Sequence, residues 1–352
     1  MISKRFGIGF CLVVTLGLLT LNLCIRAADT LPSTLSDVEF WSLTERISEP
    51  DGFFQSNSGS TDNLLSNENQ LSTVATALSM RPKGASVYLG VGPEQNFTYI
   101  AAMRSRIAFI TDIRRGNMLL HLMYKALFET SANRTDFVAH LFSRKRPAVL
   151  TTRSTAAELM NAYLRSDAVD DTSFNTNLKS ITDQLTRVHG FRLSKNDIDG
   201  IEYVYRNFRQ FGPAINYTSS INGRSGAVSY ASLMSTKDAA GVERSYLASE
   251  DNFTFVKNME THNLIVPVVG DFAGPKALQA VGSFLKDRGV TVTAFYVSNV
   301  EDYLQRNGVW SKFCANVAKL PLDSGSIFIR PNGVLSNFFF PMSSETKTCA
   351  TQ

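Results

Sequence analysis

Short apolar runs alternate with amphipathic segments along most of this chain. The run at residues 264–269 is apolar at successive positions, as expected for a parallel strand that is buried on both faces. Similar strands are expected at residues 85–89, 107–110, 290–297 and 326–330. Helical spacing follows three of the strands, at residues 94–104, 117–128 and 275–286. This alternation predicts an α/β fold with a doubly wound, mostly parallel sheet.

Two regions depart from this alternation. Residues 133–213 contain three or four helical patterns and little strand signal, which predicts a helical insertion or cap against the sheet. After it, weaker strand material is expected at residues 228–234 and 245–247. We therefore describe residues 85–352 as the main domain, with the insertion at about 133–213.

A helical and loop segment at residues 29–84 precedes the main domain. It begins with a capping box at residues 36–39, in which a serine oxygen and a glutamate carboxylate each satisfy a free backbone N–H. A loop rich in Ser, Asn and Gly follows at residues 55–70, and a second helix is expected at about residues 70–80.

The first 28 residues have the layout of an export signal. Lys4 and Arg5 precede an apolar run at residues 7–25, and residues 26–28 supply small side chains for cleavage. An uncleaved anchor is the alternative, because about 19 apolar residues nearly span a bilayer. Both interpretations predict a periplasmic or extracellular protein that contacts a membrane only through an uncleaved leader.

Charge and cysteine content exclude several classes of function. The net charge is +4, and the leader's three basic residues account for +3 of it, which leaves +1 for the rest of the chain. Without a basic stripe we expect no nucleic-acid partner. The chain has no Gly-x-Ser-x-Gly elbow, no P-loop and no Cys/His cluster with zinc spacing, so we expect no metal cofactor. Outside the leader, Cys314 and Cys349 can form a disulfide after export, and two unpaired thiols are the alternative.

The most informative stretch is a strand, a glycine turn, a helix and a second strand that ends in an acid. The turn contains Gly90 and Gly92, and the acid is Asp112. In a nucleotide-binding βαβ unit the glycines let the backbone approach a ligand at the helix N-terminus, and an acid about 20 residues on binds a ribose diol. The alternative is a tight turn in which glycine serves conformation alone.

The residues beside this turn favour one kind of ligand. Glu94 lies in the first helical turn, where the helix dipole favours its charge and where it would repel a pyrophosphate. A ligand without phosphates and with a cationic part fits better, and S-adenosylmethionine is such a ligand. NADP is a minor alternative that depends on Arg114 and Arg115 as partners of a ribose phosphate. The alternative for Glu94 is a helix-capping acid without a role in ligand binding.

Other polar residues are expected at the same crevice, because the carboxyl ends of parallel strands face one edge of the sheet. Asp271 is the candidate substrate-facing acid or general base, with a helix N-cap as the alternative. Asn299 follows another strand, and His121 lies on the helix after Asp112, where a surface or core role is the alternative. The loop residues Ser66, Asn67 and Glu68 are expected to close over the crevice.

Five motifs carry a resemblance to a known family. They lie at residues 62–68 (DNLLSNE), 87–94 (VYLGVGPE), 109–115 (FITDIRR), 270–276 (GDFAGPK) and 294–300 (AFYVSNV). Together they resemble an uncharacterised bacterial family with a class I methyltransferase-like, Rossmann-like fold, over about residues 36–331. The resemblance implies a small-molecule site for an adenosyl ligand and methyl transfer. It also leaves a non-catalytic module for a small molecule or a protein as the alternative, because Tyr88 and Leu89 stand where working methyltransferases carry an acid before the first glycine.

Overall fold

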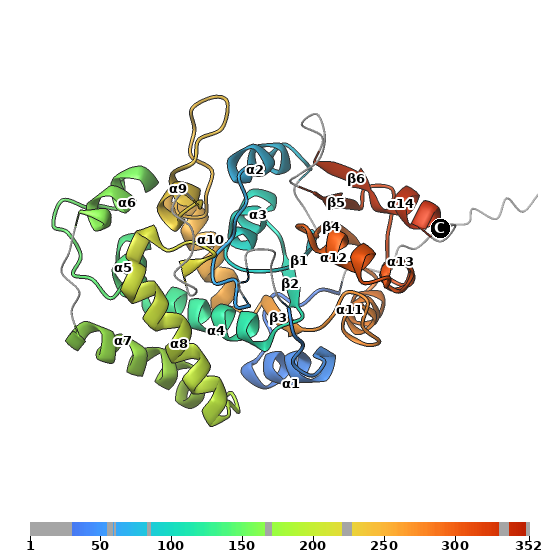
Figure 1. The fold of residues 1–352 in the computed structure, drawn as a ribbon, viewed down its shortest axis with the longest axis horizontal. Helices are drawn as coiled ribbons and strands as arrows, with labels where there is room; N and C mark the ends of the chain where they lie inside the picture. The colour runs from blue at the N-terminus through green and yellow to red at the C-terminus, as the bar shows by residue number, and fades with distance from the viewer. Residues whose placement is uncertain are drawn as a thin grey trace, which may run out of the picture.

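The computed structural model describes residues 30–54, 59, 61–82, 86–165, 171–219, 227–330 and 338–349. The predicted leader at residues 1–28 lies outside these ranges. Figure 1 shows a central sheet with helices around it, α5 to α8 grouped at one side and α11 to α14 at the other. In the described part of the chain, no helix is both long and apolar enough to cross a membrane.

Six strands form one mixed sheet in the order β3-β2-β1-β4-β5-β6. Their bounds are β1 Val87–Gly90, β2 Ile107–Asp112, β3 Ile265–Val269, β4 Val292–Tyr296, β5 Ile327–Ile329 and β6 Phe339–Pro341. The first five strands are parallel, and β6 pairs antiparallel with β5. The predicted mostly parallel α/β sheet is therefore confirmed, and its order reverses direction between β1 and β4.

The helices connect and cover these strands. Their bounds are α1 Asp37–Ile47, α2 Leu71–Ser79, α3 Gln95–Met103, α4 Arg115–Thr130, α5 Arg134–Leu141, α6 Ala156–Leu164, α7 Asp171–Asp183, α8 Lys195–Phe211, α9 Tyr230–Ser235, α10 Glu250–Thr261, α11 Ala277–Lys286, α12 Val300–Arg306, α13 Trp310–Val317 and α14 Met342–Cys349. A π-helical turn, Gln184–Val188, continues α7. The predicted capping box opens α1, where Ser36 and Glu39 bond each other's backbone N–H groups.

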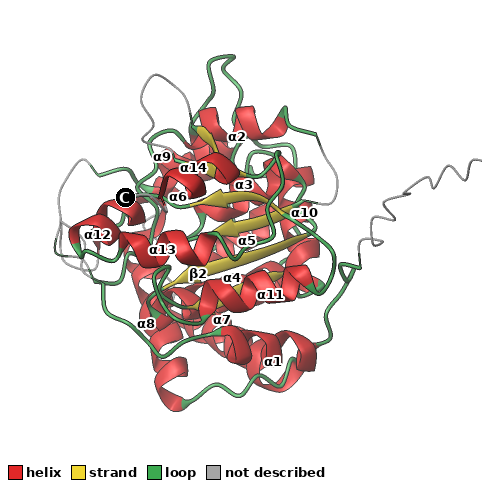
Figure 2. Cartoon of the chain, turned by 90° about the vertical axis from the view of Figure 1, so that its right-hand side faces the viewer, coloured by secondary structure: helices red, strands yellow, loops and turns green. Residues whose placement is uncertain are grey.

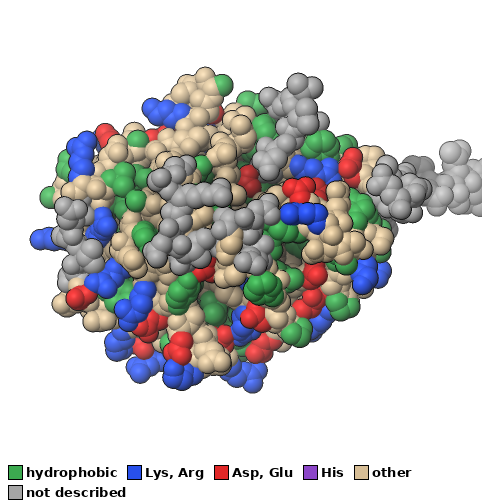
Figure 3. All heavy atoms as spheres, in the orientation of Figure 1, with side chains coloured by type: hydrophobic (Ala, Val, Ile, Leu, Met, Phe, Trp, Pro, Cys, Tyr) green, Lys and Arg blue, Asp and Glu red, His purple; other side chains and the backbone are tan. Residues whose placement is uncertain are grey.

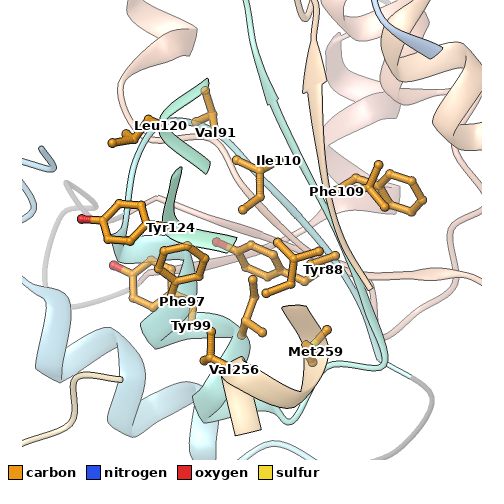
Figure 4. Close-up of a cluster of buried hydrophobic side chains, with 14 of the residues drawn as sticks. Tyr88, Val91, Phe97, Tyr99, Phe109, Ile110, Leu120, Tyr124, Val256 and Met259 are labelled. Carbon is orange, nitrogen blue, oxygen red and sulfur yellow. The ribbon is translucent and has the colours of Figure 1, made fainter. Parts of the chain in front are cut away.

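Both faces of the sheet are covered, as Figure 2 shows with strands between layers of helices. Alternate residues of each strand point to opposite faces. On one face Phe109 contacts Phe284 of α11 with ring centroids 5.4 Å apart, and Phe295 contacts Phe328 at 5.8 Å. Figure 4 shows Tyr88 and Ile110 turned to the other face, toward Phe97 and Tyr124, while Phe109 points away. The core is continuous through the sheet.

The helical insertion packs mainly on a helix that covers the sheet. Helices α7 and α8 lie against α4, and α4 in turn packs on β3. A half-buried ion pair joins the two layers, because Arg115 at the start of α4 contacts Asp197 of α8 with N–O distances of 2.6 and 2.9 Å. The predicted insertion thus forms an outer layer beside the sheet.

The two weak strand predictions are wrong. Residues 228–234 contribute instead to α9, which begins where the Ser229 side chain accepts a hydrogen bond from Ser232 N. Residues 245–247 join no strand. Their polar groups bond helices α3 and α9 instead of a strand, since Tyr246 N donates to Thr98 Oγ1 and Ser245 Oγ donates to the Met234 carbonyl.

The last strand of the sheet, β6, was not predicted. Strand β6 has three residues and includes Pro341, which is tolerated because β6 is an edge strand.

Cys314 of α13 is buried and disulfide-bonded. The side chain of Cys349, its predicted partner, lies outside the described side chains. On the molecular face in Figure 3, positive and negative side chains are interspersed.

Candidate functional site

The carboxyl ends of β1, β2, β3 and β4 meet at one cavity of about 320 Å³. This volume lies within the range of small-molecule sites. The lining residues that follow these strands are Val91, Gly92, Pro93, Gln95, Ile113, Arg114, Gly270, Asp271, Phe272, Ser298 and Asn299. The wall is completed by strand residues 111, 112 and 296, by residues 53–54, 63, 66 and 67 and by helix α12 with residues 307 and 309. The cavity therefore lies where the strand order reverses, the position at which open α/β sheets bind ligands.

The glycine turn has the shape that the sequence predicts, but its two glycines differ in role. Gly92 lines the cavity and has a φ of +76°, in the region that favours glycine. Gly90 is behind the wall, where a Cβ would lie 2.1 Å from Asn96 Oδ1. Only glycine fits at position 90 because of this packing.

Asn96 holds the turn in place, and sequence reasoning missed it. Its Nδ2 lies 2.7 to 3.1 Å from the carbonyl oxygens of Val91, Gly92 and Pro93. Its Oδ1 accepts a hydrogen bond of 2.8 Å from the Tyr88 hydroxyl. Asn96 is completely buried, so these bonds also satisfy an amide that would otherwise cost free energy to bury. Tyr88, at the place of the missing acid, thus supports the turn from inside.

Asp112 and Arg114 form a bidentate ion pair in the cavity wall. Arg114 Nε and Nη2 each lie 3.0 Å from a different Asp112 oxygen, and Arg114 N donates to Oδ1 as well. Both side chains are buried. The Arg114 guanidinium also lies 5.6 Å from the centre of the Phe54 ring. The pair neutralises its own charge and leaves Asp112 with little free hydrogen-bonding capacity.

Arg115 does not reach the cavity. Its guanidinium is bound to Asp197, so both arginines that could hold a ribose phosphate are engaged with carboxylates. Among the described residues that line the cavity, Asp271 is the charged side chain that remains besides the Asp112–Arg114 pair. The lining thus has a small negative balance, which favours a neutral or cationic ligand over a phosphate.

Glu94 faces the protein interior. Its carboxyl accepts hydrogen bonds from Ser66 N at 3.2 and 3.3 Å, and this ties the loop at residues 63–68 to the glycine turn. Burial raises the pKa of Glu94 to about 8, so the carboxyl is largely neutral at pH 7. The expected repulsion of a pyrophosphate by Glu94 therefore has no basis in this geometry.

The three predicted loop residues separate in the structure. Ser66 and Asn67 line the cavity, while the Glu68 side chain lies behind it and accepts hydrogen bonds from Tyr296 Oη and from Ser298 Oγ at 3.1 Å. Burial raises the pKa of Glu68, although the hydrogen bonds from Tyr296 and Ser298 act in the opposite direction. Glu68 thus fixes the end of β4 and the loop together.

His121 also supports the turn from behind. It is 2% exposed, and its Nε2 lies 2.9 Å from the Gly92 carbonyl oxygen. Burial lowers the pKa of His121 to about 4, so the ring is neutral and donates through Nε2. Nδ1 has no hydrogen-bond partner among the described residues. His121 does not line the cavity.

Asp271 and Asn299 line the cavity, as predicted for residues at strand ends. Asp271 Oδ1 accepts a hydrogen bond of 2.9 Å from Ala273 N. The N-terminus of α11 is capped by another residue, Glu49, whose Oε1 lies 2.8 Å from both Lys276 N and Ala277 N. The Asp271 carboxylate is therefore not needed as the helix cap.

The assembled site can bind a small molecule among backbone groups, amides and one acid. In the described part of the chain, no group of three or more His, Cys, Asp or Glu side chains is arranged to hold a metal ion. The chemistry open to the cavity is hydrogen bonding, ring contact and proton transfer at Asp271.

Comparison with known proteins gives a family without an assigned activity. A search of curated proteins found no match. A family model described as a domain of unknown function, DUF7790, matches residues 64–346, which include the six described strands and the whole glycine turn. This chain therefore belongs to the DUF7790 family of domains of unknown function.

Proposed function

We propose that this protein binds an adenosyl-type ligand, S-adenosylmethionine in particular, in the cavity and transfers its methyl group to a small molecule. One observation carries the proposal: the glycine turn at Gly92 and the acid Asp112 open on the same cavity. A class I methyltransferase-like fold accounts for this combination, with the nucleoside at the carboxyl ends of β1 and β2.

Charge favours this ligand over NADP. The two arginines beside Asp112 are bound to carboxylates, so neither offers free positive charge for a phosphate. Asp271 adds negative charge across the cavity, where a sulfonium and an amine would be stabilised. In the transfer, an acceptor lone pair bonds the methyl carbon and the C–S electron pair stays on sulfur. Asp271 is the proposed base for the acceptor proton.

A non-catalytic binding module on the same fold is the second candidate. The observation that favours it is the engagement of both Asp112 oxygens by Arg114, because a ribose diol must share or displace this partner. The export that we propose from the sequence of residues 1–28 also favours it, since S-adenosylmethionine is made and used in the cytoplasm.

Calorimetry of the purified protein with S-adenosylmethionine, S-adenosylhomocysteine and NADP tests the proposal. We expect both adenosyl compounds to bind and NADP to bind more weakly. Asp112→Asn should weaken adenosyl binding by about 1–3 kcal/mol, because a charged acceptor is lost. Arg115→Gln is the matched control, since Arg115 does not line the cavity. If neither adenosyl compound binds wild type at millimolar concentration, the binding-module candidate replaces the proposal.

Turnover is tested separately from binding. S-adenosylhomocysteine released from S-adenosylmethionine in the presence of a metabolite extract should fall at least about 100-fold in Asp271→Asn, on the scale of a lost general base. Binding of S-adenosylhomocysteine should persist in that variant. Release by wild type no faster than in buffer would reject transfer while leaving ligand binding intact.

A further inference from the structure

Residues 48–54, which we call the N-terminal strap, cross the carboxyl ends of β2 and β3. Glu49 N donates to the Val269 carbonyl at 2.7 Å, and Gly52 N donates to the Ile113 carbonyl at 2.8 Å. Asp51 Oδ1 accepts a hydrogen bond of 2.7 Å from Arg115 N. The strap precedes the part of the chain that the family model matches, yet its end reaches the cavity.

Glu49 anchors the strap at the first turn of α11. Its carboxylate accepts hydrogen bonds from the backbone N–H groups of Asp271, Lys276 and Ala277 at 2.8 to 3.1 Å. Negative charge at a helix N-terminus is stabilised by the helix dipole. A Cβ at Gly274 would lie 2.3 Å from a Glu49 oxygen, so glycine at this position makes room for the anchor. The position of the strap is therefore fixed by specific contacts.

The strap ends in two aromatic residues at the mouth of the cavity. Phe53 and Phe54 both line it, and Phe53 is 75% exposed. The Phe54 ring lies edge-on to Tyr303 of α12, with centroids 4.8 Å apart. Leaving a phenyl ring in water forgoes the stabilisation of burial, about 25 cal/mol per Å². Phe53, Phe54 and Tyr303 form what we call the aromatic wall.

The cavity lining beside the aromatic wall is largely apolar. Val300, Leu304 and Val309 line the same part of the cavity. Two arginines contact its rings: Arg306 lies 4.4 Å from the centre of the Tyr303 ring, and Arg114, beside Phe54, is paired with Asp112. Such a wall recognises a planar ring by stacking and edge contacts.

We propose that the aromatic wall is a ring-binding subsite, in which the strap holds Phe53 and Phe54 against the planar base of the bound ligand. This deepens the proposed function and rests on it for the identity of the ring as adenine. It assigns ligand contact to residues outside the matched family domain.

Saturation-transfer NMR and calorimetry test the subsite with three probes: S-adenosylhomocysteine, adenosine and indole. Phe54→Leu keeps an apolar side chain but removes the flat face, and should weaken binding of each ring compound about three- to tenfold. Phe54→Tyr should restore affinity to within about twofold, because it keeps the ring. Phe255→Leu is the matched control, since Phe255 also lies beneath an arginine, Arg104 at 4.8 Å, but does not line the cavity.

The outcomes separate the subsite from the proposed function. Binding of indole but of neither adenosyl compound, with loss in Phe54→Leu, would support the aromatic wall and overturn the adenosyl ligand. Equal affinities in wild type and Phe54→Leu, or no binding of any ring compound by wild type, would overturn the aromatic wall. Equal losses in Phe54→Leu and Phe255→Leu would also overturn it, because the effect would then be one of general stability.

Discussion

A buried and a half-buried histidine show how the surroundings shift the pKa of a single side chain. His121 has one backbone carbonyl partner, and burial lowers its pKa to about 4. His189 has a carboxylate at each ring nitrogen, with Nδ1 2.7 Å from Asp37 and Nε2 2.6 Å from Glu129. Burial alone would lower the pKa of His189, but the hydrogen bonds to the two carboxylates outweigh it and raise the pKa. The first ring is therefore neutral at pH 7, whereas the two carboxylates favour the protonated form of the second.

For His121 we predict acid sensitivity. The pKa is lower in the folded protein than the ordinary value of 6.5, so the unfolded chain binds more protons as the pH falls from 6.5 to about 4. Stability should fall by up to about 3 kcal/mol over this window through His121. Denaturant unfolding of His121→Gln, measured at pH 7 and pH 4.5, should show a smaller pH dependence than wild type. An identical pH dependence in both would contradict the assignment.

For His189 the sign is opposite. The pKa is raised in the folded protein, so the stabilisation is present below the unfolded value and is lost as pH rises through the folded value. His189→Gln should cost about 1–3 kcal/mol at pH 6 and less at pH 9. His262→Gln serves as control, because His262 is exposed. A cost for His189→Gln that grows with pH would show that the carboxylate pairs do not hold a proton on this ring.

At the scale of elements, the strap and helix α11 depend on one carboxylate. Glu49→Ala removes the acceptor for two backbone N–H groups at the start of α11 and for Asp271 N, so we predict a loss of about 1–2 kcal/mol in the free energy of unfolding. Glu45→Ala on the exposed side of α1 should change stability by less than about 0.5 kcal/mol. Hydrogen exchange at Lys276 N and Ala277 N should accelerate in Glu49→Ala, and unchanged exchange would exclude the anchor.

Helices and strands were predicted correctly where the hydrophobic pattern is long or is bounded by strong turn or capping signals. The apolar runs that became β1 to β5 and the capping box of α1 are of this kind. Residues 228–234 were wrongly predicted as a strand, and β6 was not predicted, for a shared reason. Each segment is short and rich in residues compatible with strand, so tertiary contacts decided whether it paired with a neighbour.

At the scale of the whole molecule, one hydrophobic core joins both faces of the sheet and the outer helices. We therefore predict one cooperative unfolding transition. The two tryptophans report on distant parts, because Trp41 packs on Phe191 in one region and Trp310 on Phe313 in another. In each single-tryptophan variant, Trp41→Phe and Trp310→Phe, the denaturation midpoint measured by fluorescence should coincide with the midpoint measured by circular dichroism. Two separated transitions would mean that the outer helices unfold as an independent unit.

The amino-acid pattern alone predicts the alternation of strands and helices, the glycine turn and the acids at strand ends. These features are local, because strand burial, turn conformation and helix capping depend on neighbouring residues. Three-dimensional contacts are needed to see that Arg114 binds Asp112, that Glu94, Glu68 and His121 support the cavity from behind, and that Glu49 brings Phe53 and Phe54 to its mouth. Partners in most of these contacts are 28 to 228 residues apart in the chain, and no local pattern encodes which distant group will satisfy a buried charge or an open helix end.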